Sequence, residues 1–351
     1  MSKPTLKAVD FFCSGGGMTC GLNLGGIKVI AGIDNDPACR DTYELNNPEA
    51  EFILADVFDL TPQKLAQDLS LNIRDDNLVL IGCSPCQFWS IIQTDKSKSE
   101  KSKNLLMEFK RFVDYLQPGY LLVENVPGIL SKKAQSGLDS FIADLKKNGY
   151  KVHYEVINMN DYGVPQSRRR FSLVATRLHS NAIFPKKDNR TRPKVKDVLG
   201  EKNGFKKIKA GYKDQTIFNH SAAGISQLNL ARLKKTKKSG GSWLDWANDK
   251  ELGREKYTGR EFVDNYGRLD WDKPAPTITT KFISISNGRF AHPQEHRGLS
   301  IREGATLQTF PTTYVFPDAR LTVSAKIIGN AVPPLFAKRL AETIVEAHKQ
   351  V

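Results

Sequence analysis

The chain of 351 residues is long enough for one large domain or two of ordinary size, and its 40% hydrophobic and 26% charged residues are typical of soluble globular proteins. No apolar run approaches the roughly 20 residues that span a bilayer, and the first residues lack the pattern of a signal peptide. The five cysteines are odd in number and scattered, which fits a reducing compartment better than a disulfide framework. We therefore expect a cytoplasmic protein, or a nuclear one if the source is a eukaryote, with no membrane partner.

The net charge of +14 is concentrated in one part of the chain. Residues 186–240 contain 16 lysines and arginines and 4 acidic residues, a net charge of +12, whereas the other 296 residues are nearly neutral. A block of one sign, interleaved with glycines and aromatic residues, favours contact with nucleic-acid phosphates over a merely solvated surface.

Strands and helices are predicted to alternate along the first half of the chain. Apolar strands are expected at 6–12, 27–34, 51–57, 78–81, 120–123, 152–158 and 171–176. Helices are expected at 39–45, 62–71, 105–116 and 141–148. This alternation indicates an α/β fold built on a doubly wound, mostly parallel sheet.

The composition changes after residue 185. Basic and glycine-rich segments of weak periodicity run to about residue 270, and a smaller domain of irregular structure is expected there. A long amphipathic helix is predicted to begin near Pro333 or Pro334 and to pack back on the first domain. The expected division is therefore 1–185 plus about 300–351 for the first domain, and about 186–299 for the second.

A glycine-rich turn follows the first strand and indicates a nucleotide site. Gly15–Gly17 allow positive φ and a close approach of the backbone. Asp34 ends the second strand, where an acidic residue commonly binds a ribose hydroxyl, and the third strand ends near Asp56. Because Cys20 stands where the third glycine of GxGxxG would be, a dinucleotide and an adenosine-containing cofactor without a pyrophosphate both remain open.

Two cysteines follow the fourth strand in the stretch IGCSPCQ. A redox pair is one interpretation, but a thioredoxin domain is much shorter than this chain. A zinc site would need two more ligands, and His292 and His296 lie about 200 residues away; we interpret them as loop or DNA-facing residues. Cys83 suits a small buried apolar position at a strand end. Cys86 is expected to project from the loop as a nucleophile.

A carboxylate and a group of cations could assist such a nucleophile. Glu124 in VENVPG ends an apolar strand on the same edge of the sheet, and QSRRR at 166–170 supplies arginines after the next strand. Each charge could lie on the surface in isolation. Together with Cys86 they form a constellation that is suited to covalent catalysis.

In this order, the motifs resemble those of the C5-cytosine DNA methyltransferases of bacterial restriction-modification systems. The similar stretches are DFFCSGGGMTCG, GIDND, Asp56, SPCQ, ENV, QSRRR, PAPTITT and GNAVPP. They cover nearly the whole chain except about 186–265. Two departures are Cys13-Ser14, where the family usually has alanine-glycine, and Asp34, where it often has glutamate. The resemblance implies the fold of S-adenosylmethionine-dependent methyltransferases.

The resemblance also implies a mechanism and its catalytic residues. Cys86 would attack C6 of a flipped-out cytosine, and Glu124 would hold N3 and the exocyclic amine. C5 would then take the methyl group from S-adenosylmethionine, a base would remove the C5 proton, and elimination would free the cysteine. Arg170 would contact the cytosine O2, with Arg168 beside it.

A cofactor site is implied at the ends of the first strands. Phe12 would stack near the adenine, Asp34 would bind the ribose hydroxyls, and Asp56 would bind the adenine amine. The expected cofactor residues are Phe12, Ser14, Gly15, Gly16, Gly17, Asp34, Asn35, Asp56, Val57, Pro85, Leu105, Asn330 and Ala331. No metal is expected.

Residues 186–265 lie where the family has its target-recognition region, which makes double-stranded DNA the expected partner. The likeliest contact loops are NHSAAG, KKSGGSW and NYGRLDW. The expected DNA contacts are Gln87, Gln166 (chiefly as a support of its loop), Lys234, Lys235, Lys237, Lys238, Gly240 and Gly241. We expect a monomer and leave open a cognate restriction endonuclease that acts separately. A tRNA cytosine methyltransferase, a nicotinamide-dependent oxidoreductase and a non-catalytic DNA-binding module remain as alternatives.

Overall fold

The computed structural model describes residues 5–84, 104–131, 136–188, 192–253 and 264–351. Its contacts divide the chain into two compact units. Unit 1 contains residues 1–162, 169–188 and 331–351, and unit 2 contains 163–168 and 189–330. Residues 300–330 therefore cluster with the second unit, whereas the sequence had led us to place them in the first. Among the helices described, none is both long and apolar enough to cross a membrane.

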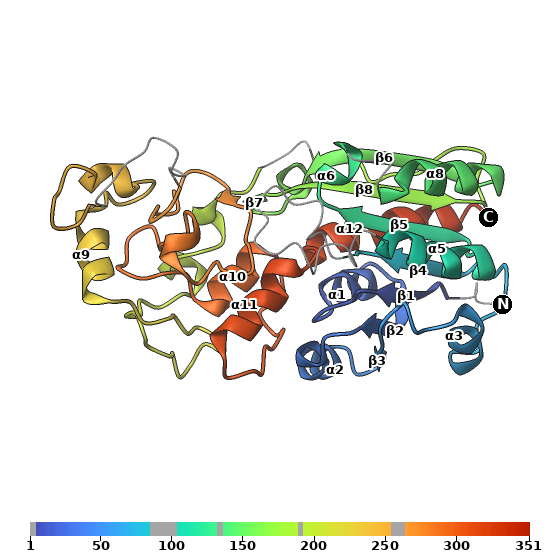
Figure 1. Cartoon of the computed structure of the whole chain (residues 1–351), viewed down its shortest axis with the longest axis horizontal. Helices are drawn as coiled ribbons and strands as arrows, with labels where there is room; N and C mark the ends of the chain where they lie inside the picture. The colour runs from blue at the N-terminus through green and yellow to red at the C-terminus, as the bar shows by residue number, and fades with distance from the viewer. Residues whose placement is uncertain (1–4, 85–103, 132–135, 189–191, 254–263) are drawn as a thin grey trace. The chain divides into compact units, whose positions relative to one another are not determined.

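Unit 1 is built on a seven-stranded sheet with the order β3-β2-β1-β4-β5-β8-β6 (Figure 1). The strands are β1 Lys7–Phe11, β2 Lys28–Asp34, β3 Glu51–Leu54, β4 Leu78–Gly82, β5 Tyr120–Asn125, β6 Lys151–Asn158 and β8 Arg169–Thr176. The first five pair in parallel, and β8 runs antiparallel to both β5 and β6. This confirms the predicted α/β fold with a mostly parallel sheet.

Strand β8 is antiparallel for a reason of chain length. A parallel return needs a crossover of a dozen or more residues, usually a helix. Only residues 159–168 separate β6 from β8, and they hold a single short 3₁₀ turn, η3 Met159–Tyr162, and the two-residue strand β7 Gln166–Ser167. The chain therefore turns back beside β6 and inserts β8 next to β5.

Helices cover both faces of this sheet. They are α1 Gly17–Leu24, α2 Arg40–Asn46, α3 Pro62–Asp68, α5 Leu105–Leu116, α6 Gly128–Ser131, α8 Leu138–Lys147 and α12 Pro334–His348. Helix α5 has the bounds that its periodicity predicted. The predicted third strand is shorter, because Asp56 already lies in a turn, where its carboxylate accepts a hydrogen bond from the Phe58 amide at 3.1 Å.

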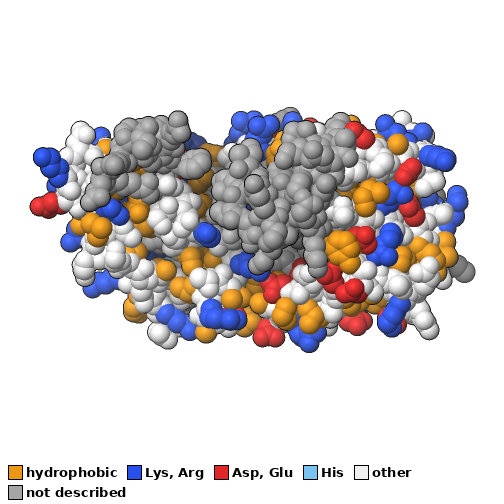
Figure 2. Space-filling model, viewed as in Figure 1, with side chains coloured by type: hydrophobic (Ala, Val, Ile, Leu, Met, Phe, Trp, Pro, Cys, Tyr) orange, Lys and Arg blue, Asp and Glu red, His pale blue; other side chains and the backbone are white. Residues whose placement is uncertain are grey.

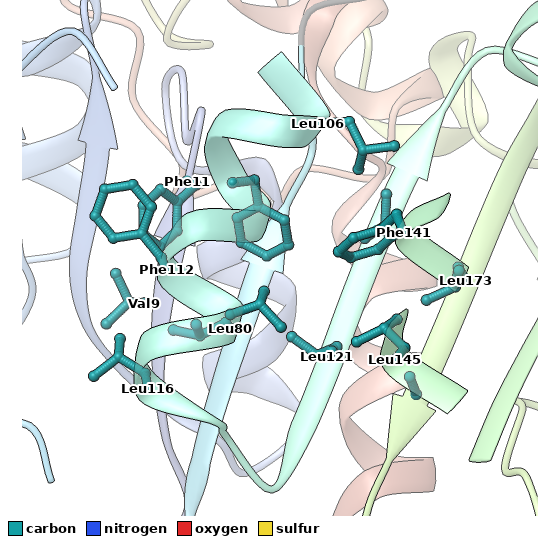
Figure 3. Packing of buried hydrophobic residues seen from close by; sticks show 14 of the residues in the cluster. Val9, Phe11, Leu80, Leu106, Phe112, Leu116, Leu121, Phe141, Leu145 and Leu173 are labelled. Carbon is teal, nitrogen blue, oxygen red and sulfur yellow. The ribbon is translucent and has the colours of Figure 1, made fainter. Parts of the chain in front are cut away.

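The core of unit 1 lies between the sheet and helices α5 and α8 (Figure 3). Helix α5 buries Leu106, Phe109, Phe112, Val113 and Leu116, which recur at the spacing of one helical face. The Phe112 ring lies 4.8 Å from that of Phe11 in β1, centroid to centroid. Burial of each such side chain contributes about 1.5–3 kcal/mol. The core therefore fixes the strands whose carboxyl ends carry the motif residues.

The last helix packs on the other face, as the sequence predicted. Gly21 of α1 contacts α12 so closely that a methyl group on it would overlap the Pro334 carbonyl oxygen and the Ala337 side chain. The two prolines at 333 and 334 stand at the start of α12, where the first helical amides need no partner within the helix. The C-terminal segment is thus locked to the glycine-rich start of the chain.

Unit 2 has short elements joined by long loops. The longer helices are α9 Gln227–Lys235, α10 Ile301–Leu307 and α11 Leu321–Asn330, and β7 pairs in parallel with β9 Ala275–Pro276. Helix α9 was not expected. Only Leu233 is fully buried in it, so its sequence lacks the apolar stripe of a predictable helix.

A buried charge cluster explains why residues 300–330 belong to unit 2. The Arg297 guanidinium donates two hydrogen bonds to Glu303 at 2.7 and 2.8 Å and two to Glu295 at 3.0 and 3.1 Å. Arg297 holds the pKa of the fully buried Glu303 at about 2, against the effect of burial. Glu303 also closes the N-terminus of α10 through a capping box with Ser300. The loop that contains Glu295 and Arg297 is therefore joined to α10 by charge-assisted hydrogen bonds.

Candidate active site

The turn between β1 and α1 has an unusual backbone. Phe12, Ser14 and Gly16 take positive φ values of 63°, 48° and 82°. The first two are not glycines, and positive φ outside glycine costs energy and tends to occur at functional sites. The sequence had assigned this freedom to all three glycines, but among them only Gly16 uses it; Gly17 begins α1.

Asp34 ties the end of β2 to this turn. Its carboxylate accepts the Ser14 amide at 2.8 Å on one oxygen and the Asp36 amide at 2.9 Å on the other. A carboxylate oxygen has two lone pairs, so each can accept more than one donor. Asn35 follows, exposed to solvent. The predicted ribose-binding residue thus lies beside the glycine-rich turn, at the carboxyl end of its strand.

The other residues expected to bind the cofactor have mixed environments. Val57 is buried in the hydrophobic core, and its carbonyl accepts a hydrogen bond from Arg111 at 2.9 Å. Phe12 and Leu105 are partly buried against the same core. Asn330 ends α11 in unit 2 and is exposed, whereas Ala331 is buried in unit 1.

A buried carboxyl group lies beneath the glycine-rich turn. Asp10 in β1 is fully buried and accepts a hydrogen bond from the Thr19 hydroxyl at 2.8 Å. Its other oxygen is buried with no hydrogen-bond partner in the described structure. Burial is the main cause that raises its pKa to about 7. Through its hydrogen bond with Thr19, this carboxyl group joins β1 to α1 beneath the turn.

Glu124 and Arg170 form an ion pair. Glu124 is the penultimate residue of β5 and Arg170 the second of β8, and the antiparallel pairing of these strands brings the side chains together. The Arg170 Nε atom lies 3.2 Å from the Glu124 carboxylate, with side-chain exposures of 13% and 8%. The structure thus joins the predicted acid to one of the predicted arginines.

The residue after Glu124 holds the segment that leads to Cys86. Asn125 donates to the Ser84 hydroxyl at 3.0 Å and accepts the Val126 amide at 2.8 Å. Both Asn125 and Ser84 are buried. Sequence reasoning used ENV only for its glutamate and missed this contact. Pro85, Cys86 and Gln87 lie outside the described residues.

Two side chains of the QSRRR motif point into unit 2. Gln166 is fully buried and bonds to Gln308 at 2.8 Å and to the Ile278 amide at 2.8 Å. Arg168 is 2% exposed and donates to the carbonyls of Ile278 and Gly329 at 3.2 and 3.4 Å. Gln166 therefore supports its loop, which is the role chiefly expected of it, and its buried amide is bonded within the unit instead of being exposed to DNA. Arg168 likewise joins the QSRRR, PAPTITT and GNAVPP segments.

The basic residues at the end of α9 are exposed but partly paired. Lys237 lies 3.8 Å from Asp245, and Lys235 lies 4.0 Å from Asp249. Lys238 donates to the Gln294 carbonyl. Lys234 is exposed. These acids follow residue 240 in sequence and so lie beyond the basic segment 186–240.

Glycines in this region serve packing. A side chain at Gly241 would overlap the Lys237 carbonyl, and Gly240 has a φ of 88°.

Two polar side chains of segments that the sequence placed in loops are interior. Arg268, in the predicted contact loop NYGRLDW, is fully buried and donates to the carbonyls of Leu233 and His292, both at 2.7 Å. His292 is also buried, which lowers its pKa to about 4, and its Nδ1 accepts the Glu295 amide at 3.0 Å. His292 lies in a loop, which is one of the two positions expected for it, but its side chain does not face outward. Both side chains are buried beside the apolar cluster of unit 2, where backbone groups satisfy their hydrogen bonds.

His292, Glu295 and Glu303 lie close enough together to hold a metal ion. Arg297 already supplies the positive charge between the two carboxylates. No described feature of this cluster calls for a cation.

The chain belongs to the C-5 cytosine-specific DNA methylase family, whose pattern matches residues 6–346. It is 38% identical over 347 residues to the Type II methylase M.HgiDII of Herpetosiphon aurantiacus, covering 96% of this chain and 94% of that protein. It is 31% identical to the Type II methyltransferase M.DdeI of Desulfomicrobium norvegicum, covering 97% and 88%.

Solved structures show the same fold. A putative DNA modification methyltransferase encoded within an E. coli prophage superposes with a TM-score of 0.74 at 22% identity, covering 98% of this chain and all of that one. The Dnmt2 methyltransferase of S. pombe gives 0.65 at 16% identity, covering 98% and 99%. The protein is thus a DNA cytosine-5-methyltransferase of the restriction-modification type that uses S-adenosylmethionine. Family membership rules out the nicotinamide-dependent alternative.

Proposed function

We propose that the enzyme methylates C5 of a cytosine that is flipped out of a specific duplex sequence, through a covalent bond between Cys86 and C6. The observation that supports this most is the Glu124–Arg170 pair, with its 3.2 Å separation. It lies next to Asn125, which bonds to Ser84, two residues before the cysteine. The acid and the cation therefore lie beside the segment that leads to the proposed nucleophile.

The proposed reaction begins with the Cys86 thiolate. Its sulfur bonds to C6 while the electron pair of the C5–C6 double bond moves toward C5. Glu124 hydrogen bonds to N3 and the exocyclic amine and stabilises the resulting enamine, and Arg170 orients the base through O2. C5 takes the methyl group. A base then removes the C5 proton, and the electrons of that C–H bond restore the double bond as the sulfur leaves. Flipping is required because C6 is out of reach within the stacked duplex.

We propose that the cofactor is held at the carboxyl ends of β1–β3. When bound, S-adenosylmethionine supplies an electrophilic methyl group. The left-handed turn of residues 12–16 and the Asp34 carboxylate, whose oxygens can each accept more than one donor, suit its amino acid and ribose parts. The proposed contacts are Phe12, Ser14, Gly15, Gly16, Gly17, Asp34, Asn35, Asp56, Val57, Pro85, Leu105, Asn330 and Ala331.

Unit 2 is proposed to recognise the DNA target. It contains nearly all of the basic segment, and its phosphate contacts would include Lys234, Lys235, Lys237 and Lys238. The relatives named above are Type II enzymes. We therefore infer that this enzyme is the modification half of a restriction-modification system, with a cognate endonuclease that acts separately.

DNA that carries 5-fluorocytosine at the target tests the mechanism. Fluorine cannot leave as the C5 proton does, so elimination stops and enzyme and DNA stay joined after methyl transfer. We expect a complex that survives denaturation, requires S-adenosylmethionine, and is absent for Cys86→Ala, which should still bind DNA. Glu124→Gln should bind DNA but react roughly 10²–10⁴-fold more slowly.

The matched control is Cys83→Ser, which removes the neighbouring thiol and should keep both the adduct and turnover. A denaturation-resistant adduct formed by Cys86→Ala would assign the nucleophile to another residue. Loss of activity in Cys83→Ser with an intact fold would reopen a role for the cysteine pair.

A further inference from the structure

A short hairpin in unit 2 is held in one conformation. Residues 211–222 fold back on themselves: the Gly211 amide donates to Ala222 at 3.1 Å, and the Asp214 amide donates to His220 at 3.0 Å. Lys213 and Ser221 form an antiparallel bridge between these bonds. The two arms are thus paired up to a tip at residues 215–219.

Polar side chains fix the tip from within. One oxygen of Asp214 accepts the amides of Thr216 and Ile217, both at 2.7 Å. These bonds hold the Asp214 pKa at about 2, with the Thr216 hydroxyl as the largest cause. The Asp214 carboxylate is therefore stabilised by hydrogen bonds from within the turn.

The far side of the tip is anchored to the body of unit 2. Asn219, with a φ of 61°, donates to the Phe316 carbonyl at 2.8 Å and accepts the Phe316 amide at 3.1 Å. The buried Arg302 donates to the Phe218 carbonyl at 3.2 Å. His220 is fully buried and bonds to Ser300 and to the Lys206 carbonyl, both at 2.9 Å. Little conformational entropy remains to be lost at this tip when a ligand binds.

This rigid hairpin presents large side chains to solvent. Phe218 is 55% exposed and Tyr212 50%, and Lys213 and Gln215 are also exposed. Residues 201–221 contain five lysines and two acidic residues. The ammonium group of one of these lysines, Lys206, lies 3.3 Å from the Thr216 hydroxyl. Four of these lysines precede the hairpin, at 202, 206, 207 and 209. Exposed aromatic and amide side chains on an anchored hairpin, next to this basic segment, fit a surface that binds a polyanion with specific contacts.

We propose that this hairpin enters a groove of the duplex and reads the target sequence, an inference that rests on the proposed function. A two-stranded ribbon fits the major groove of B-DNA, where glutamine and lysine can bond to base edges and an apolar ring can contact a thymine methyl group. Gln215 and Lys213 are assigned to base edges and Phe218 to the apolar contact. The lysines of the α9 end are long and exposed, and are suited to phosphates instead.

The test compares purified Phe218→Ala and Gln215→Ala with the unaltered enzyme on a duplex library of random sequence, with S-adenosylmethionine present and bisulfite sequencing as the readout. We expect each variant to methylate the preferred sequence about 5- to 150-fold more slowly, as befits one lost base contact. The methylation rate on sequences changed at one base should fall less. The ratio of the rates on preferred and changed sequences therefore decreases. The salt dependence of DNA binding should stay unchanged.

Ile73→Ala is the matched control, because Ile73 is also 55% exposed but lies in unit 1. This variant should keep the methylation rate and the sequence preference of the unaltered enzyme. Variants of Phe218 and Gln215 that keep both within twofold would overturn the inference, as would an equal loss on all sequences. If the unaltered enzyme methylates no duplex at all, it is the proposed function that fails.

Discussion

Asp10 illustrates how a single buried group sets a pH dependence. The folded protein holds its pKa at about 7, against an ordinary value of 3.8. As the pH rises, the unfolded chain releases this proton at a lower pH than the folded protein does. The contribution of this group to the free energy of unfolding is present below pH 4 and is lost as the pH rises to about 7. At about 1.4 kcal/mol for each pH unit, the loss is about 4 kcal/mol as an upper order of magnitude.

Asp10→Asn should remove this loss. An amide stays neutral, and its oxygen can still accept the Thr19 hydroxyl. We expect the variant to be more stable than the unaltered protein at pH 8, by up to a few kcal/mol, and similar to it at pH 4. Urea unfolding at the two pH values measures this. Equal pH dependence in both proteins would show that Asp10 is ionised in the folded state.

Two arginines of the same motif, Arg168 and Arg170, have different environments in the structure. The pair Glu124 and Arg170 came together as the motifs predicted. Arg168, two residues before Arg170, turned into unit 2 instead, although both belong to QSRRR. Two residues that are two positions apart on an extended chain face the same side, but this spacing does not determine which carbonyl groups each guanidinium will meet. The acceptors of Arg168 lie 110 and 161 residues further on.

At the scale of elements, α1 and α12 approach closely at glycines, of which Gly21 lies within α1. Gly21→Ala should raise the helix propensity of α1 by up to about 1 kcal/mol. The added methyl group would nevertheless overlap Pro334 and Ala337, and such overpacking costs about 1–3 kcal/mol. We expect a net loss of stability in thermal unfolding.

The control for this prediction is Gly224→Ala. The space around Gly224 is open within 4 Å, so the same substitution should leave the melting temperature nearly unchanged. A Gly21→Ala protein that melts no earlier than this control would show that the two helices can separate without cost.

Elements also differed in how well the sequence predicted them. Helix α5 was predicted to the residue because five of its side chains face a core. Helix α9 was missed because only Leu233 is fully buried, and the helix is fixed by loops instead. Its Arg232 stacks on Trp246 and Tyr266, with its guanidinium carbon 5.2 and 5.0 Å from the ring centres.

At the scale of the whole molecule, charge is unevenly distributed. On the face in Figure 2, most acidic side chains lie over the unit with the seven-stranded sheet, and the charged side chains of the other unit are mostly lysine and arginine. Each phosphate neutralised by DNA binding changes the slope of log K against log salt by about 0.9. The steepness of the slope therefore reflects the number of phosphates that lysines and arginines neutralise.

Lys234→Gln should flatten this slope by about 0.9, if its ammonium meets one phosphate. Lys237→Gln should flatten it less, because Asp245 at 3.8 Å already offsets part of the Lys237 charge. Fluorescence anisotropy with a labelled duplex at several salt concentrations measures both slopes. Lys146→Gln, an exposed lysine in α8 of unit 1, is the control, and a Lys234→Gln slope equal to that of the control would remove Lys234 from the interface.

The sequence by itself determined the fold class, the family and the order of the motifs. Apolar periodicity is a local property, and it specifies which segments become strands and helices. The motifs occupy the turns at strand ends, so the position of Glu124 at one edge of the sheet follows from the order of strands and turns along the chain.

Only the tertiary structure decided which polar side chains face inward and where the units divide. Gln166, Arg268 and His292 look like surface residues in the sequence, yet each is buried and bonded to partners distant along the chain. Residues 300–330 join unit 2 through the bonds of Arg297 to Glu303. Burial of a polar group is favourable only when its partners are in place. Those partners meet only when the chain folds, so no local pattern could reveal them.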